Sequence, residues 1–262
     1  MPTTYAHDLF GKLVSQRLDK KAQEMLNKHK NQFAIGLHGP DILFYVHPFC
    51  TNRVNRVGYT MHQQTAEEFF KKGRALYQQT KDEALLAYLS GFVCHFMLDS
   101  ICHPFIGKYI DKTGAPHDEI ETEFDRALME QTGKNPFRYH PACVIHGERE
   151  SIRVISSVLD GIAEKDVRQA LWGMKLYTGI TVCKGPLKRN FMLGVGKVAG
   201  IYDLVQGRII RRQPVERCLQ STQELKRLFK LAVPETVTVL DEFLKNVEST
   251  GELNPRFNRN YN

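Results

Sequence analysis

The chain has 262 residues, of which 42% are hydrophobic and 25% are charged. This composition excludes a disordered protein, and the moderate content of Gly and Pro excludes a collagen-like one. The net charge is +7, and residues 181–262 hold 14 Lys or Arg against 8 Asp or Glu, so most of the excess lies in the last third. A basic surface can attract nucleic acid or anionic lipid, but the basic runs are short, which favours an ordinary solvated surface.

Apolar residues recur at helical spacing along almost the whole chain, and the alternating runs typical of strands are hard to find. We therefore predict an all-α fold, with a single multi-helix domain over residues 1–250 and an extended or loosely ordered tail at 251–262. The residues between 36 and 58 are rich in Gly, Pro and Asn, so we predict a long loop there, a kind of segment that is often functional. The predicted helices cover residues 9–30, 64–80, 82–103, 117–131, 148–160, 164–177, 190–206, 214–230 and 234–247, with Pro214 and Pro234 in first turns.

The N-terminus and the cysteines indicate the compartment. The first residues lack the basic start and apolar run of a secretory signal, so we expect a cytoplasmic protein, although a processed secreted chain would look the same. The six cysteines show no Cys-x-x-Cys pair and no dense framework, which favours reduced thiols.

Candidate ligands concentrate in the apolar helix predicted at 82–103. His95, Asp99 and His103 follow one another at intervals of four residues, so they form one stripe along that helix. An isolated buried carboxylate is very costly, and a metal ion bound by these side chains would compensate for that cost. The spacing therefore predicts metal ligation.

The next predicted helix repeats this arrangement. His117 and Glu121 are also four residues apart, and the loop before them can fold their helix back against the first, so that five candidate ligands converge. Histidine nitrogen and carboxylate oxygen without thiolate suit zinc or another borderline divalent metal. The alternative for this pair taken alone is an ordinary intrahelical pair.

Five motifs follow one another within the first 125 residues: Thr4-Tyr-Ala-His7, Gly39-Pro-Asp41-Ile-Leu-Phe-Tyr, Gly58-Tyr-Thr-Met-His62, the His95/Asp99/His103 helix and the His117/Glu121 pair. In this order they resemble the zinc-dependent phospholipase C family, which is related in fold to the S1/P1 nucleases. The resemblance implies a mostly helical domain with a trinuclear zinc cluster that hydrolyses phosphodiesters.

The resemblance also implies which side chains bind each of two or three zinc ions. One ion would be held by Asp41, His62, His95 and Asp99, and a second by His103, His117 and Glu121. Asp99 would bridge to a third, completed by His7.

In the family, the amino group and carbonyl of the first mature residue complete that third site. Here Pro2 would take this place after removal of Met1. Asp41 is the candidate catalytic residue, because a carboxylate at the metals can orient or deprotonate the attacking water.

The implied activity is that of a zinc-dependent phosphoric diester hydrolase, in which a metal-activated water attacks a phospholipid or a small phosphodiester. Two alternatives stay open: an S1/P1-like nuclease, and a degenerate, non-catalytic metal-binding protein. No obvious series of aromatic residues for base stacking lies beside the motifs, so a nucleic-acid partner is disfavoured. A phospholipid substrate would bring transient contact with a membrane surface, and the sequence leaves the oligomeric state open.

Overall fold

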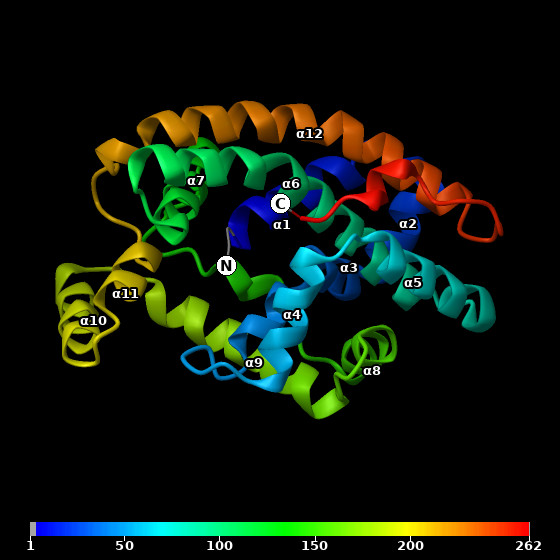
Figure 1. Cartoon of the computed structure of the whole chain (residues 1–262), viewed down its shortest axis with the longest axis horizontal. Helices are drawn as coiled ribbons and strands as arrows, with labels where there is room; N and C mark the ends of the chain where they lie inside the picture. Colours follow the sequence, from blue (N-terminus) through cyan, green and yellow to red (C-terminus); the bar gives the residue numbers. More distant parts are fainter. Residues whose placement is uncertain (1–3, 262) are drawn as a thin grey trace.

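The computed structural model describes residues 4–261, and within them it contains helices and no strand, which confirms the all-α prediction. The first half of the chain forms α1 (Thr4–Ser15), α2 (Lys20–Lys28), α3 (Lys30–Gly36), η1 (Gly39–Tyr45), α4 (Arg53–Gln63), α5 (Glu67–Thr80), α6 (Glu83–Thr113) and α7 (His117–Gln131). The second half forms η2 (Pro141–Val144), α8 (Arg149–Val158), α9 (Glu164–Thr181), α10 (Pro186–Val198), α11 (Tyr202–Arg208), η3 (Glu216–Cys218), α12 (Leu219–Lys245) and η4 (Pro255–Asn258). The 3₁₀ helices carry the symbol η. Figure 1 shows the long helix α12 running along α6 and α7, with α10 and α11 at one end of the molecule.

Helix α6 forms the centre of the core. Every residue from Ala84 to Ser100 is buried, and α3 and α12 pack on this helix. By length and composition α6 could cross a membrane, but 94% of its most apolar window is buried inside the protein, as expected of a core helix. The carboxylate of Asp82 caps its first turn, and Gly114 ends it in the left-handed conformation.

Two glycines bring α3 into backbone contact with α6. A Cβ atom at Gly36 would lie 2.2 Å from the carbonyl oxygen of Tyr88, and one at Gly91 would lie 2.2 Å from that of Phe33. Because only glycine permits so close an approach, this pair sets the distance between the two helices. It also brings η1, which follows α3 directly, against α6.

Several predicted helix boundaries are wrong near the N-terminus. The predicted helix at 9–30 is two helices, because Asp19 accepts a hydrogen bond from the backbone N–H of Ala22 and starts α2. The predicted loop at 36–58 contains η1 and the first half of α4, which begins after a capping box formed by Asn52 and Asn55.

Prolines and one glycine account for other differences. Helix α6 continues through Pro104, and Pro234 lies inside α12, which replaces the two helices predicted at 214–230 and 234–247. A proline removes one backbone hydrogen bond, and buried side chains beyond each proline keep the helix packed. Pro214 precedes η3 and does not start a helix. The predicted helix at 190–206 is α10 and α11, separated near Gly200, whose φ is +70°.

The prediction of a loosely ordered tail is wrong, because residues 251–261 pack on the core. Phe257 is completely buried, and its ring lies 4.4 Å from that of Phe70 and 5.8 Å from that of Phe96, centroid to centroid. Tyr261 is also buried, with its ring 4.9 Å from that of His62. The aromatic residues of the tail therefore complete the core beside α4, α5 and α6.

We predict that Gly91→Ala destabilises the protein by about 1–3 kcal/mol, because the added methyl group overpacks the contact between α3 and α6. The free energy of unfolding in urea, followed by circular dichroism, measures this loss. Gly107→Ala is the matched control, because it lies in the same helix with nothing within 4 Å of its Cβ position, and there alanine should be neutral or stabilising by about 0.5–1 kcal/mol. Equal stabilities of the two variants would contradict the prediction.

Candidate metal centre

Asp99, in the middle of α6, lies among four imidazoles. The Nε2 atoms of His7 and His95 are each 3.2 Å from a carboxylate oxygen of Asp99, that of His103 is 3.7 Å away and that of His62 is 3.9 Å away. Burial raises the pKa of this carboxyl, but His103, His95 and His7 outweigh burial and hold the pKa well below its usual range. Asp99 is therefore a buried anion surrounded by possible metal ligands.

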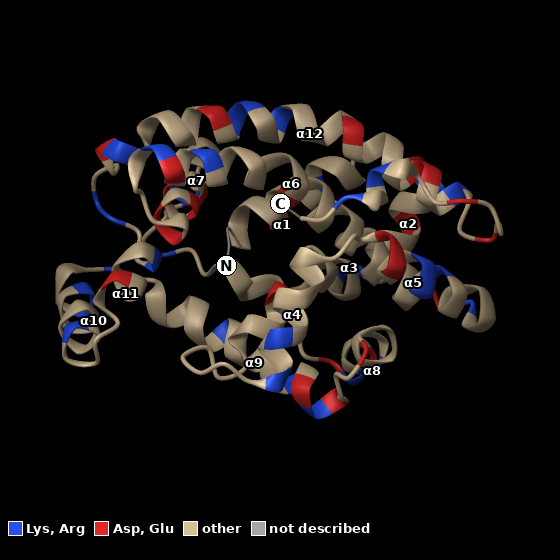
Figure 2. Ribbon diagram, in the orientation of Figure 1, with Lys and Arg blue, Asp and Glu red and all other residues tan. Residues whose placement is uncertain are grey.

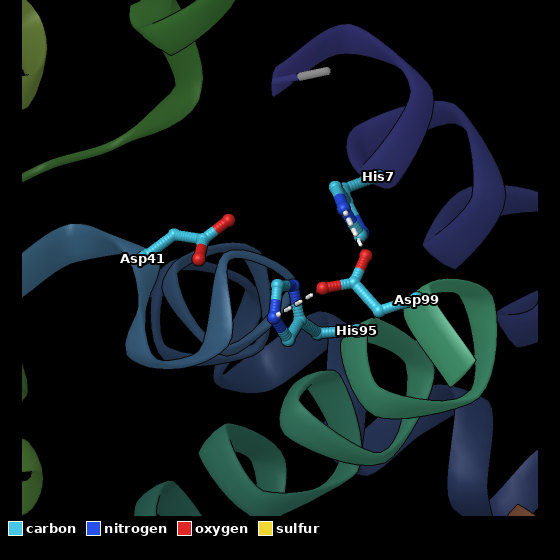
Figure 3. Close-up of side chains that lie close together, drawn as sticks. All are labelled: His7, Asp41, His95 and Asp99. Carbon is cyan, nitrogen blue, oxygen red and sulfur yellow. Dashed lines mark ion pairs between the residues drawn. The ribbon is translucent and has the colours of Figure 1, made fainter. Parts of the chain in front are cut away.

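A first group of candidate ligands comes from three separate elements. His7, Asp41, His95 and Asp99 each offer one ligand atom, and these atoms lie within 4.8 Å of one another. Figure 3 shows these side chains converging from α1, η1 and α6, with His7 and His95 directed at the carboxylate of Asp99. His62 of α4 adjoins the group, because its Nε2 lies 3.1 Å from Oδ1 of Asp41.

A second group joins α6 to the first two turns of α7. His103, His117 and Glu121 also offer ligand atoms within 4.8 Å of one another. Oε1 of Glu121 lies 2.9 Å from Nε2 of His117 and 3.7 Å from Nε2 of His103. His103 contacts both Glu121 and Asp99, so it connects the His117/Glu121 pair of α7 to the first group. His117 and Glu121 are therefore more than an isolated intrahelical pair. All eight predicted ligand side chains thus lie in one site.

A cavity of about 10 Å³ lies between the two groups. Its lining includes His7, Asp99, His103 and Glu121, and its volume is close to that needed by a single water molecule. Cys102 also lines it, but burial raises the pKa of this thiol, which keeps it protonated. The donors at this cavity are therefore imidazole and carboxylate groups.

The elements that carry the ligands are held by residues that the sequence analysis did not single out. The backbone N–H groups of Tyr5 and Ala6 donate to the carboxylate of Asp125 over 3.0 and 2.8 Å, which fixes the first turn of α1 and hence His7. Burial raises the pKa of Asp125 to about 7.

Gly39 lets η1 approach the ring of His95. It has a φ of +47°, and a Cβ atom there would lie 2.1 Å from Cδ2 of His95. The left-handed conformation and the contact both require glycine. The glycine of the Gly39-Pro-Asp41 motif therefore allows η1 to pack against His95.

Backbone carbonyls orient two of the imidazoles. Nδ1 of His62 lies 2.8 Å from the carbonyl oxygen of Gly58, and Nδ1 of His103 lies 3.0 Å from that of Tyr261. A carbonyl oxygen accepts only from a protonated Nδ1, so in the neutral ring this geometry puts the lone pair on Nε2, which faces the centre. Metal-binding histidines are commonly oriented in this way.

The chemistry of His95 fits a bound metal ion. It is completely buried, and neither ring nitrogen makes a hydrogen bond with any residue of the described range 4–261. Burial lowers its pKa to about 4, so the ring is neutral and keeps a lone pair. Leaving a buried polar group without a partner costs about 1–3 kcal/mol, and a metal ion removes that penalty.

His38, His29 and His47 lie outside the two groups of candidate ligands. His38 is buried, with its ring centroid 6.4 Å from that of His7, and burial lowers its pKa to about 3. His29 lies 3.5 Å from Glu83 and His47 contacts Gln169, both away from the ligands. The predicted role of Pro2 at the third ion lies outside the described residues.

Part of the basic C-terminal third is tied to α7. Arg211 and Arg217 both donate to the carboxylate of Glu119, and Arg208 donates to Asp118 over 3.0 Å. Glu119 is buried, and in the sequence of α7 it lies between His117 and Glu121 of the second group. These arginines therefore neutralise acidic groups of α7.

Comparison with known proteins gives one family. Residues 1–169 match the family described as zinc dependent phospholipase C. No curated protein matches the chain, and no solved structure matches it. The family match contains all eight candidate ligands and extends beyond the 125 residues that hold the motifs.

We predict that zinc content falls when either ligand group is broken. Glu121→Gln retains the volume of the side chain but removes its charge, so the protein should lose about one zinc ion per chain, measured by elemental analysis after dialysis. His95→Ala should lower the content through the first group. His146→Ala, at an exposed histidine outside the site, is the control, and a loss there equal to that of Glu121→Gln would contradict the assignment.

We also predict a pH dependence for the metal-free protein. Burial lowers the pKa of His103, but Asp99 and Glu121 raise it more, from 6.5 to about 9. Because the folded-state pKa is the higher one, protonation of His103 stabilises the fold fully below pH 6.5, and this stabilisation is lost as the pH rises to about 9. The urea midpoint should fall over that range, and less so in His103→Gln. A midpoint that depends on pH equally in both proteins would contradict this.

Proposed function

Since the chain belongs to the zinc-dependent phospholipase C family, we propose that it is a zinc-dependent hydrolase of phosphodiesters, with a phospholipid or a smaller phosphodiester as substrate. The observation that carries the proposal is the convergence of four imidazoles on the buried carboxylate of Asp99, next to a second group of His and Glu ligands. Such a site can bind several metal cations close together, and clustered cations stabilise the negative charge of a phosphoryl group.

We assign ligands to the proposed ions as the resemblance to the family implies. The first ion would be held by Asp41, His62, His95 and Asp99, and the second by His103, His117 and Glu121. A third ion would use His7 and the other oxygen of Asp99, an arrangement supported by the 3.2 Å separation of His7 Nε2 and Asp99 Oδ1. Zinc, when bound, neutralises the phosphoryl group, lowers the pKa of water and stabilises the leaving oxygen.

Asp41 is the proposed catalytic residue of the chain. It is buried in η1, and Oδ1 lies 3.1 Å from Nε2 of His62. His62 lowers the pKa of Asp41 against the opposing effect of burial, so the carboxylate is ionised and able to accept a proton. In the proposed mechanism it orients the water that attacks phosphorus and takes its proton.

The two alternative functions, a non-catalytic metal-binding protein and an S1/P1-like nuclease, would need different features of the chain. A degenerate binding protein would need only some of the candidate ligands, whereas this chain brings all eight into two adjoining groups. An S1/P1-like nuclease would use basic residues near the site on nucleic acid, whereas the three arginines that contact α7 are paired with Asp118 and Glu119. Both observations support the phospholipase C type of activity.

We predict that Asp41→Asn lowers the turnover of a chromogenic phosphodiester by about 10²–10⁴-fold, because the amide cannot accept the proton of the attacking water. Zinc content is measured on the same samples, since a loss of metal would also lower the rate. Unchanged hydrolysis at full zinc content would remove Asp41 from the mechanism.

Parallel assays on phosphatidylcholine micelles and on single-stranded DNA separate the functions. Hydrolysis of the lipid supports the phospholipase activity, and faster cleavage of DNA would favour the nuclease. Zinc-loaded protein that hydrolyses none of the three substrates would identify a non-catalytic metal-binding protein.

A further inference from the structure

Helix α10 exposes a stripe of large apolar side chains. Leu187 is 87% exposed, Phe191 is 69% exposed and Val198 is 92% exposed. Their spacing of four and seven residues places them on one face of the helix. Figure 1 shows α10 at one end of the molecule, beyond α11 and away from the central helix α6. We call this face the α10 stripe; an exposed apolar face of this kind marks an interaction site.

The charges around the α10 stripe are basic. Between residues 181 and 212 the sequence has seven Lys or Arg and one acidic residue, a net charge of +6. Figure 2 shows basic and no acidic segments on α10. Arg208 and Arg211 are paired with α7, whereas within residues 4–261 no carboxylate pairs with the remaining five, Lys184, Lys188, Arg189, Lys197 and Arg212.

A partner that covers the α10 stripe must therefore be both apolar and anionic. A second copy of the chain would bring the same basic side chains into contact and would be repelled. A membrane of anionic phospholipid provides acyl chains for Leu187 and Phe191 and phosphate groups for the lysines. Helices with this combination of residues lie in the headgroup region of membranes.

Behind α10 lies an apolar cavity of about 440 Å³. Helix α10 lines it with Met192, Val195 and Gly196, and α11 lines it with Leu204 and Val205. Most of the other lining residues are also apolar. The volume is within the range of small-ligand sites in proteins.

Part of the cavity lining comes from the helices that carry candidate metal ligands. Thr4, Tyr45 and Thr122 line the cavity, and they lie within four residues of His7, Asp41 and Glu121, respectively, in the same helices. The cavity thus extends from the inner side of α10 to the turns that carry the metal ligands.

We propose that the α10 stripe docks on an anionic phospholipid membrane and that the cavity behind α10 takes an acyl chain of a lipid from it. This proposal depends on the proposed function in one respect, namely that the bound lipid is then hydrolysed as a substrate. Docking and chain binding need no hydrolysis, so they are measured separately from it.

Sedimentation with vesicles tests the docking. The zinc-loaded protein should bind vesicles of phosphatidylcholine mixed with phosphatidylglycerol more strongly than vesicles of phosphatidylcholine alone. Leu187→Ser with Phe191→Ser should weaken binding by about tenfold or more, because two inserted side chains are lost. Lys188→Glu with Lys197→Glu should weaken it on the anionic vesicles only, by about tenfold or more.

Leu231→Ser is the control for docking, because this leucine of α12 is 55% exposed and lies outside the α10 stripe. Equal binding by wild type and Leu187→Ser/Phe191→Ser would overturn the proposal. A wild-type dimer that these substitutions convert to monomer, with no binding of vesicles, would also overturn it. Vesicle binding without hydrolysis would leave docking standing and refute only the proposed function.

Calorimetric titration with oleate tests the cavity. Met192→Trp fills the cavity and should weaken oleate binding by about tenfold or more, since part of the apolar contact is lost. Leu193→Trp is the matched control, because the neighbouring residue of α10 does not line the cavity. Equal affinities of the two variants, or no binding by the wild type, would overturn the assignment of the cavity.

Discussion

The carboxylate of Asp99 is buried in the central helix with four imidazoles around it, and this group of charges constrains the rest of the fold. A buried anion needs a nearby cation. Without metal, protons on His7, His62 and His103, whose pKa values Asp99 raises, provide the positive charge, whereas zinc binds only neutral rings. Binding of zinc would therefore displace protons from the histidines around Asp99. Both the metal affinity and the folding stability would then depend on pH.

Bringing those ligands together requires close contacts between backbones. Gly36 and Gly91 let α3 approach α6, and Gly39 then lets η1 reach the ring of His95. These glycines lie in the segment between α1 and the centre of α6, where any side chain would push Asp41 away from the histidines. The precision of the site therefore depends on residues that have no ligand atoms themselves.

The helical class and the convergence of five candidate ligands could be predicted from sequence, because a spacing of four residues fixes a stripe on a helix wherever the helix lies. The order of the motifs suffices for the family, and only the resemblance to the family pointed to His7, Asp41 and His62. The supports could not be predicted in this way. Asp125 holds α1 across 120 residues of chain, and the carbonyl of Tyr261 orients His103 across 158. Such contacts are decided by packing, as is the continuation of two helices through Pro104 and Pro234.

The contact between Tyr261 and His103 gives the order in which the protein can mature during synthesis. His7 and Asp41 leave the ribosome early, and the remaining ligands have emerged by Glu121, yet the carbonyl that orients His103 is made more than a hundred residues later. The orientation of His103 is therefore completed only after Tyr261 has been made and the tail has packed on the core.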